Sequence, residues 1–275
     1  MPAAATRKSK SAKSKSSAKR ASKPAKSGKP AKGKAGKMVY YFGKAKTEGG
    51  ATMKALLGGK GANLADMTSI GLPVPPGFTI TTDTCAAYYD NKSRLPKGLM
   101  DEVQKNVRTL EKELGKKLGD KKNPLLVSVR SGARVSMPGM MDTVLNLGLT
   151  DAVTEGLAAA TGNRRFAYDA YRRLINMFGD VVMGVDHEHF EHAFDQIKSR
   201  LGVTEDTQVP AEGLVDLCNE YKRVYREHVG AEFPQDPMRQ LELSIEAVFK
   251  SWNADRAISY RRLSNITGLN GTAVN

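Results

Sequence analysis

Cysteine, tryptophan and long apolar runs are all scarce in this sequence. Among 275 residues there are two cysteines, Cys85 and Cys218, and one tryptophan. Two cysteines so far apart do not form the disulfide framework of a small secreted domain, so they indicate a reducing compartment, and we expect the cytoplasm. No apolar run approaches the ~18 residues of a membrane span, and the N-terminus lacks the apolar segment of a signal peptide. We therefore expect no membrane partner.

Acidic residues are absent from the first part of the chain. Residues 1–37 contain thirteen Lys or Arg and no Asp or Glu, which leaves 30 basic and 29 acidic residues for the remainder. This tail of Lys, Ala and Ser has little apolar surface to offset its ordering entropy, so we expect disorder. The tail could bind nucleic acid or anionic lipid through its charge, act as a targeting segment, or merely solubilise the chain. It has no aromatic residue, so base stacking is not supported.

A glycine-rich segment with one lysine follows the first expected strand. Gly58-Gly59-Lys60-Gly61 precedes Ala62-Asn63-Leu64, which predicts a glycine turn that leads into a helix with Lys60 at its N-terminus. A helix N-terminus with a lysine favours an anion. The segment is not a phosphate-binding P-loop, because no Ser or Thr follows the lysine and the upstream glycine spacing differs.

Residues 125–147 form the centre of the sequence pattern. An apolar, β-branched run from Leu125 to Val129 predicts a buried strand, and residues 143–147 predict a second one. Two arginines, Arg130 and Arg134, lie where the first strand meets a loop rich in Gly, Ser and Met. Freed backbone N–H groups and guanidinium forks both suit phosphate. An ordinary hairpin with a basic rim is the alternative.

Helices and further strands follow from periodicity and turn residues. We expect strands at 39–42 and 78–81, a helix capped by Thr82 or Asp83 with Cys85 in the core, and a strand that starts at 271. The expected helices share apolar spacing near 3.6 and cover residues 99–114, 151–160, 164–182, 212–229 and 241–252. His189 and His192 are spaced to share a metal, but no second cluster completes a ligand set, so we predict no metal site.

Several long phrases carry a family resemblance. L-L-V-S-V-R-S-G-A-R-V-S-M-P-G-M-M-D-T-V-L-N-L-G, R-F-A-Y-D-A-Y-R-R and F-K-S-W-N-A-D-R-A-I-S-Y-R-R-L, with G-G-K-G and P-V-P-P-G-F, resemble the amino-terminal nucleotide-binding domain of pyruvate, phosphate dikinases. The resemblance implies an α+β fold similar to the first part of an ATP-grasp domain, with a helical subdomain. It implies boundaries at 1–37 for the disordered tail, 38–150 for the first subdomain, 151–235 for the helical subdomain and 236–275 for the start of a truncated subdomain.

The resemblance also implies roles for particular residues. Lys60 and Arg130 would hold nucleotide phosphates, Arg173 would add a contact, and Arg134 would brace the loop. The loop would close over the phosphates as a lid, with contacts from Ser136, Gly139, Met140, Met141, Asp142 and Thr143. Two cations and a set of N–H groups would neutralise the charge of a phosphoryl transition state. ATP would enter with Mg²⁺, whose ligands we expect beyond residue 275.

The family reaction needs more than these residues. It interconverts pyruvate, ATP and phosphate with phosphoenolpyruvate, AMP and pyrophosphate by way of a catalytic histidine on a separate domain. None of the four histidines has the phosphohistidine sequence neighbourhood. The pyruvate-binding domain is absent, and Thr267 and Leu269-Asn270 depart from the family pattern. We expect this chain alone to be inactive, and the full-length family member to be a homodimer with phosphohistidine and pyruvate-binding domains as partners.

Two other functions remain open at this point. Pyruvate, water dikinases share the G-G-K and P-V-P-P-G-F segments, although the S-M-P-G-M-M-D-T-V-L-N loop has the phosphate dikinase form. A non-catalytic module that binds anions or nucleic acid through a basic tail is the competing class.

Overall fold

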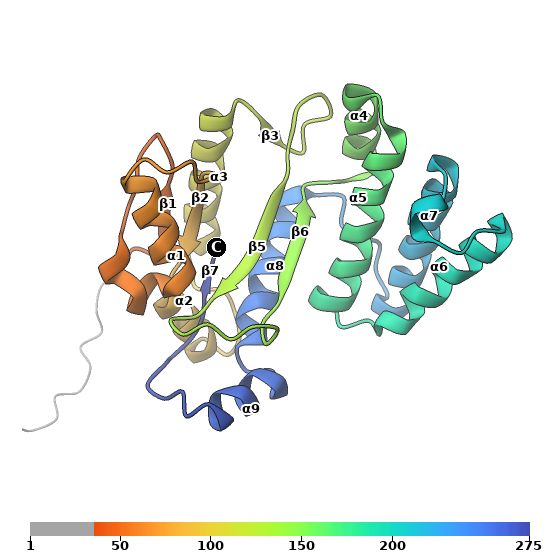
Figure 1. Ribbon diagram of the computed structural model, residues 1–275. Helices are drawn as coiled ribbons and strands as arrows, with labels where there is room; N and C mark the ends of the chain where they lie inside the picture. The colour runs from red at the N-terminus through yellow and green to blue at the C-terminus, as the bar shows by residue number, and fades with distance from the viewer. Residues whose placement is uncertain (1–35) are drawn as a thin grey trace, which may run out of the picture. The chain divides into compact units, whose positions relative to one another are not determined.

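Five antiparallel strands form the main sheet of the computed structural model, which describes residues 36–275. Their order is β1-β2-β7-β5-β6, and their bounds are Val39–Phe42 for β1, Gly77–Ile80 for β2, Ala273–Val274 for β7, Val127–Gly132 for β5 and Thr143–Leu147 for β6. The sheet thus consists of two antiparallel pairs, β1 with β2 and β5 with β6, that β7 joins (Figure 1). The predicted disorder of residues 1–37 concerns a tail that lies almost wholly outside the described residues.

The short strand β7 sets the register of the sheet. Val274 lies opposite Ile80 of β2 and Ser131 of β5. Asn275 continues the ladder, because its N–H donates to the Arg130 carbonyl at 2.8 Å and its carbonyl accepts from the Arg130 N–H at 2.8 Å. The strand predicted to start at residue 271 is therefore a central strand of the sheet.

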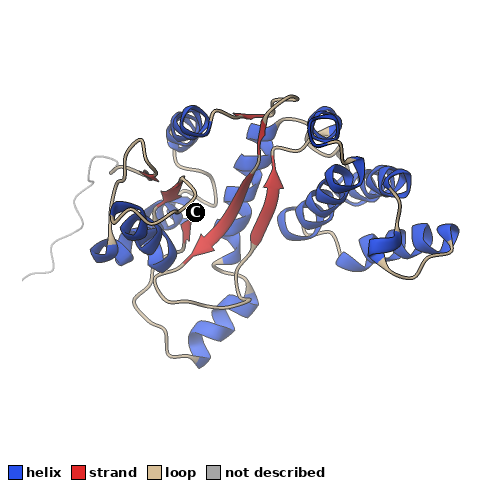
Figure 2. Ribbon diagram, turned by 45° about the horizontal axis from the view of Figure 1, so that its top comes forward, coloured by secondary structure: helices blue, strands red, loops and turns tan. Residues whose placement is uncertain are grey.

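Helices cover the sheet on the side of its core. Helix α8 (Pro237–Ser251) packs on β5, β6 and β7, and lies behind β5 and β6 in both ribbon views (Figures 1 and 2). We call the sheet and the elements beside it the sheet half. Its other elements are the 3-10 turn η1 (Ala51–Met53), α1 (Lys54–Ser69), α2 (Thr82–Asp90), α3 (Leu99–Leu114), the small parallel pair β3 (Lys117–Leu118) and β4 (Pro124–Leu125), and α9 (Asp255–Leu263). The face of β5 and β6 opposite α8 carries no helix in either view among the residues described.

A group of helices, which we call the helical group or helical half, adjoins the sheet along β6. It comprises α4 (Asp151–Thr161), α5 (Arg164–Met177), the π-turn η2 (Phe178–Val182), α6 (His187–Leu201), the 3-10 turn η3 (Asp206–Gln208) and α7 (Ala211–Val229). Helix α5 packs on both α7 and β6. The centre is aromatic: Phe178 lies 6.4 Å from Tyr225 and 5.5 Å from Phe233 between ring centroids. All three rings are buried, so this group has its own dense packing.

Most predicted elements are confirmed, and the mixed α+β class is correct. The bounds of β6 and α3 match the prediction at both ends. The predicted cap of α2 is wrong: Thr81, rather than Thr82 or Asp83, accepts the Thr84 N–H through its side chain. Thr81 therefore ends β2 one residue earlier than predicted.

Other features of the described chain bear on its class. Lys37–Asn275 forms one compact unit, so the boundaries at residues 150 and 235 stay a prediction. Cys85 and Cys218 are buried and free. Within residues 36–275, no helix is both long and apolar enough to cross a membrane.

Candidate phosphate site between Lys60 and Arg130

A break in α1 places Lys60 against β5. Gly58 has φ 68° and ψ 174° inside the helix, so the helix bends there and starts again at Gly59. The N–H of Gly59 donates to the Ala133 carbonyl at 2.9 Å. A Cβ on Gly58 would lie 1.6 Å from the Gly132 carbonyl oxygen, so only glycine permits this approach. The predicted helix start near Lys60 is confirmed in this sense, although helical residues also precede the break.

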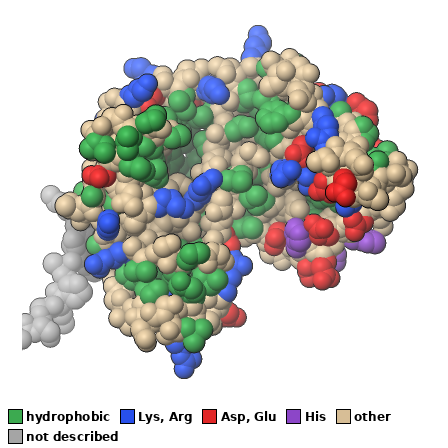
Figure 3. All heavy atoms as spheres, in the orientation of Figure 1, with side chains coloured by type: hydrophobic (Ala, Val, Ile, Leu, Met, Phe, Trp, Pro, Cys, Tyr) green, Lys and Arg blue, Asp and Glu red, His purple; other side chains and the backbone are tan. Residues whose placement is uncertain are grey.

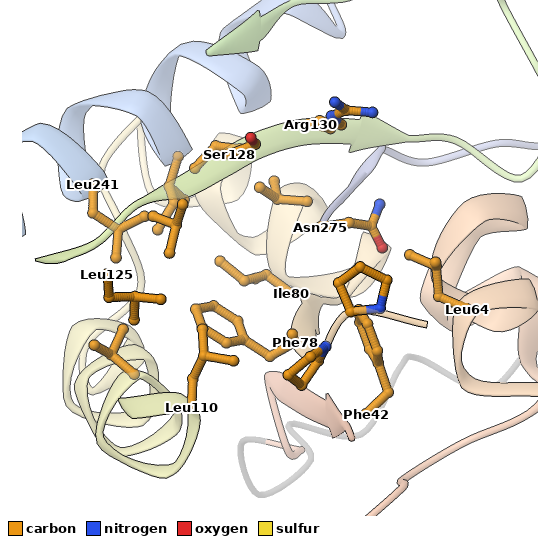
Figure 4. Close-up of a pocket in the computed structure, with 18 of the residues that line it drawn as sticks. Phe42, Leu64, Phe78, Ile80, Leu110, Leu125, Ser128, Arg130, Leu241 and Asn275 are labelled. Carbon is orange, nitrogen blue, oxygen red and sulfur yellow. The ribbon is translucent and has the colours of Figure 1, made fainter. Parts of the chain in front are cut away.

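Lys60 and Arg130 meet at one cavity. The cavity has a volume of about 650 Å³ and lies between β2 and β5, where Asn275 follows β7. Figure 4 shows Arg130 and Asn275 toward one end, with Leu110 and Leu125 farther along. Apolar side chains from α3, β2, β5 and α8 form most of the wall. An apolar hollow with a few polar groups at its edge is the usual form of a small-molecule site.

The two cations are not neutralised by the protein. The Lys60 ammonium donates to the Ser131 carbonyl at 3.0 Å, and neither Lys60 nor Arg130 forms an ion pair within residues 36–275. Desolvation by neighbouring atoms and the positive charge of Arg130 lower the pKa of Lys60. Two adjacent positive charges with no carboxylate partner favour an anion between them.

The alternation of side chains along β5 explains why the Arg130 side chain is exposed and can contact a ligand. Val129 is buried toward the core, whereas Ser128 and Arg130 are exposed on the other face of β5. Thr143 of β6 lies directly opposite Arg130 in the antiparallel register. The structure therefore brings three of the predicted residues together: Lys60, Arg130 and Thr143.

Methionine side chains anchor the loop between β5 and β6 to the core. Met137 is buried, and Met140 and Met141 pack against the main core. Ser136 and Gly139 are exposed, and Gly139 has φ 70° with no atom within 4 Å of an added Cβ. Exposed and anchored residues therefore alternate along the loop, with the buried Met137 between Ser136 and Gly139.

Asp142 and Arg173 lie outside the cavity. Asp142 pairs with Arg256 of α9, and burial raises the pKa of the Asp142 carboxyl despite that partner. Arg173 is exposed on α5 and donates to Asp169 at 2.9 Å. These two predicted residues do not line the cavity with Lys60 and Arg130, so their roles stay predictions.

Two polar residues at the cavity were not predicted as site residues. Ser128 and Asn275 line it. Asn275 accepts a hydrogen bond from the Thr79 hydroxyl at 2.9 Å, and its side-chain nitrogen is buried without a partner. The two-residue period from Arg130 could have identified Ser128, but nothing local in the sequence indicates Asn275.

No metal-binding group is present in the described part of the chain. No cluster of three or more His, Cys, Asp or Glu side chains there could hold an ion. His189 stacks on His228 at 3.9 Å between ring centroids, and His192 contacts Gln196. The residues near Lys60 therefore do not fit a protein-held Mg²⁺.

Taken together, the sheet and the broken helix define an α+β domain in which two cations without carboxylate partners line one cavity. Residues 54–97 and 92–274 match the family model described as pyruvate phosphate dikinase, AMP/ATP-binding domain. The chain belongs to this family.

Named relatives agree with that assignment. The chain is 56% identical over 239 residues to "Pyruvate, phosphate dikinase, chloroplastic" of Mesembryanthemum crystallinum, which covers 87% of this chain and 25% of the relative. It is 56% identical over 241 residues to "Pyruvate, phosphate dikinase 1, chloroplastic" of Arabidopsis thaliana, covering 88% and 25%. For "Pyruvate, phosphate dikinase 2" of Zea mays the identity is 55% over 243 residues, covering 88% and 27%. The chain thus spans about a quarter of the length of these relatives.

Proposed function

We propose that this chain is the nucleotide-binding part of a pyruvate, phosphate dikinase, and that it binds the phosphates of ATP between Lys60 and Arg130. The observation that carries the proposal is the pair of unneutralised cations at the mouth of an otherwise apolar cavity. In the complete enzyme, the γ-phosphoryl group would pass to a histidine on a separate domain. The cations would stabilise charge that spreads over the phosphate oxygens as the bond to the leaving group lengthens.

Loop residues complete the proposed site. Ser136 and Gly139 lie at the exposed tip, where backbone N–H groups can turn toward phosphate oxygens. Met140 and Met141 would act indirectly, since they anchor the loop to the core. Thr143 would contact a phosphate beside Arg130. Asp142 would set the position of the loop through Arg256, and Arg173 would reach the nucleotide only if a ligand displaced its bond to Asp169.

The complete protein requires further parts. We propose phosphohistidine and pyruvate-binding domains as partners, a homodimer, and ATP that enters with Mg²⁺ bound to its phosphates. We assign no ligand of that ion to residues 36–275. We also propose a cytoplasmic location, which two buried free cysteines support; plastid fractionation tests it, because several relatives are named chloroplastic.

The decisive experiment measures phosphohistidine formation in the chain extended to the length of its relatives. Lys60→Ala and Arg130→Ala should each reduce the rate at least a hundredfold, because charge-assisted contacts in a phosphoryl transition state are worth roughly 3 kcal/mol or more. Arg262→Ala on α9 is the control: it also removes one exposed arginine, away from the cavity. Equal losses in the control and the two site variants would refute the assignment.

Product analysis separates the two dikinase classes. A phosphate dikinase requires inorganic phosphate and releases pyrophosphate, whereas a water dikinase requires no added phosphate. We expect phosphate dependence, which the S-M-P-G-M-M-D-T-V-L-N loop and the names of the relatives support. For the 275-residue chain alone we expect weak ATP binding or none; tight Mg²⁺-dependent binding in calorimetry would contradict that expectation.

A further inference from the structure

Helix α3 presents a stripe of cations away from the phosphate cavity. Lys105, Arg108 and Lys112 recur at intervals of three and four residues, so they share one face. The opposite face, with Val103 and Leu110, is buried in the core. The turn after β1 adds two more cations, and the whole set lines an open hollow of about 790 Å³ made by Lys44, Ala45, Lys46, Lys105, Arg108, Thr109, Lys112 and Glu113. We call this set the α3 basic hollow.

The carboxylates of α3 do not neutralise these cations. Glu102 accepts the backbone N–H groups of Met38 at 3.2 Å and Val39 at 3.0 Å. Glu111 accepts the Leu118 N–H at 2.9 Å. These acidic side chains hold neighbouring segments of backbone, so they form none of the ion pairs that a mixed-charge helix usually has.

Glu113, the one carboxylate in the hollow, is occupied in the same way. It accepts the N–H groups of Lys44 at 2.8 Å and Ala45 at 2.9 Å, and the Tyr41 hydroxyl at 3.0 Å. Desolvation raises the pKa of Glu113, but these hydrogen bonds outweigh it and leave the pKa below its ordinary value. Glu113 is therefore charged, and its oxygens are directed at the turn rather than at the lysines of the helix.

Within residues 36–275, Lys44, Lys105, Arg108 and Lys112 form no ion pair, and only Lys46 does, with Glu48 at 3.2 Å. From Lys105 to Lys112 the stripe is roughly 10 Å long at ~1.5 Å per residue. Like charges at helical spacing repel one another. A polyanion that lies along the stripe would remove this repulsion and release its own counterions.

The lining of the hollow restricts the kind of partner. It contains no aromatic side chain, so stacking on single-stranded bases is not supported. It contains no large apolar side chain that could enter a bilayer. A duplex presents phosphates in rows without requiring either contact.

The junction between the basic tail and the rest of the chain is linked to the α3 basic hollow. Lys37, the last of the thirteen cations in residues 1–37, pairs with Glu48 at 2.5 Å, and Glu48 also pairs with Lys46 of the hollow at 3.2 Å. We propose that the α3 basic hollow binds the phosphate backbone of duplex nucleic acid without sequence preference, independently of the nucleotide cavity.

The test is the salt dependence of binding to a 20-base-pair DNA duplex, measured by fluorescence anisotropy with the full chain. The triple variant Lys105→Gln, Arg108→Gln and Lys112→Gln should reduce the slope of log K against log salt by about 2 to 3, at ~0.9 per lost phosphate contact. The control is Lys54→Gln, Lys250→Gln and Arg262→Gln, which removes the same charge from exposed positions outside the hollow. It should leave the slope unchanged.

Three outcomes would overturn the proposal. Equal slope changes in the two triple variants would show that only net charge matters. An unchanged slope in the α3 variant would assign all binding to the tail. Tighter binding of vesicles with 30% phosphatidylserine than of the duplex, abolished by the α3 variant, would assign the surface to a membrane instead. Circular dichroism of each variant checks that α3 is retained, because all three α3 substitutions lie on its exposed face.

Discussion

The sheet half and the helical half of the described chain differ in how some of their charged side chains are paired. In the helical group, cations are paired with nearby carboxylates: Arg172 and Arg173 both contact Asp169, and Arg223 contacts Glu220 and Glu227. Acidic and histidine side chains also gather over α6 and α7 on the face in Figure 3. In the sheet half, Lys60, Arg130 and the stripe on α3 have no such partners within residues 36–275.

This difference separates two uses of charge. Ion pairs on the helical group add a little to folding, since exposed pairs are worth about 0–1 kcal/mol each. Unpaired cations add nothing to folding, and they cost repulsion when they lie together. Their concentration on one half indicates that this half carries the sites for anions, whereas the helical group is a support whose stability comes from its aromatic interior.

Phe178→Ala tests the aromatic interior and should have the largest effect. The ring is fully buried against Tyr225 and Phe233, so its removal leaves a cavity and should cost about 3–5 kcal/mol of unfolding free energy. Urea denaturation measures this loss. Phe166→Ala is the control, because Phe166 is 50% exposed, and its loss should be below about 1 kcal/mol. Similar losses for both would contradict a packed core at η2.

Gly58→Ala tests the contact between α1 and β5. The new methyl group would overlap the Gly132 carbonyl at a backbone φ of 68°, so strain and overpacking together should cost about 2–4 kcal/mol. Gly230→Ala is the matched control: its φ is 73°, but no atom lies within 4 Å of the added Cβ, and it should cost about 1 kcal/mol. Thermal unfolding distinguishes them. If the two losses were equal, the close approach at Gly132 would not exist.

The pKa of Lys60 predicts a pH dependence of nucleotide binding. The pKa of Lys60 lies below the ordinary value of 10.5 because of desolvation and the positive charge of Arg130. The Lys60 ammonium is therefore charged at pH values well below this lowered pKa, and it loses its proton as pH rises through it. In the chain extended to its relatives' length, ATP affinity should therefore fall about tenfold on the alkaline side, since a charge-assisted hydrogen bond is worth roughly 1.5–3 kcal/mol. Titration calorimetry from neutral to alkaline pH measures this. Lys60→Arg should flatten the profile; an identical profile would assign the pH effect elsewhere.

Asp169→Asn and Lys105→Gln compare a charge that forms an ion pair with one that does not. We expect these two substitutions to have the smallest effects. Asp169 is the close partner of the buried Arg172, at 2.9 Å, with Asp206 farther away at 3.7 Å. Its neutralisation should cost about 1–2 kcal/mol. Lys105 has no partner within the described chain, so Lys105→Gln should change stability by less than about 0.5 kcal/mol. Paired melting curves decide this, and a larger loss for Lys105→Gln would reverse the comparison.

Local signals account for the parts of the fold that the sequence predicted well. The alternation in residues 143–147 and the apolar spacing in residues 99–114 specify β6 and α3 without help from the rest of the chain. The glycine at position 230 marks the end of α7 in the left-handed conformation typical of helix ends. Arg130 follows a buried strand residue by one position, and that is why its exposure was predictable.

The features that the sequence patterns did not indicate are particular side-chain contacts. Thr81 caps α2 directly after Ile80, the last residue of β2, which pairs with Val39 of β1 and with Val274 of β7. The nucleotide contact of Asp142 stays a prediction, and its ion pair with Arg256 joins it to α9, a helix that the sequence pattern did not predict. Arg173 donates to Asp169 on the same helix, and its nucleotide contact also stays a prediction. Of these side-chain contacts, only the pair of Asp142 with Arg256 joins residues far apart in the sequence.

The central position of β7 has a consequence for biosynthesis. The hairpin of β5 and β6 and the pair of β1 and β2 leave the ribosome long before residues 273–274. At roughly 5–20 residues per second, the delay is on the order of ten seconds. During this interval both pairs carry open strand edges, which favour mispairing with other chains. Until the strand that joins the two pairs has been translated, the sheet cannot close between β2 and β5.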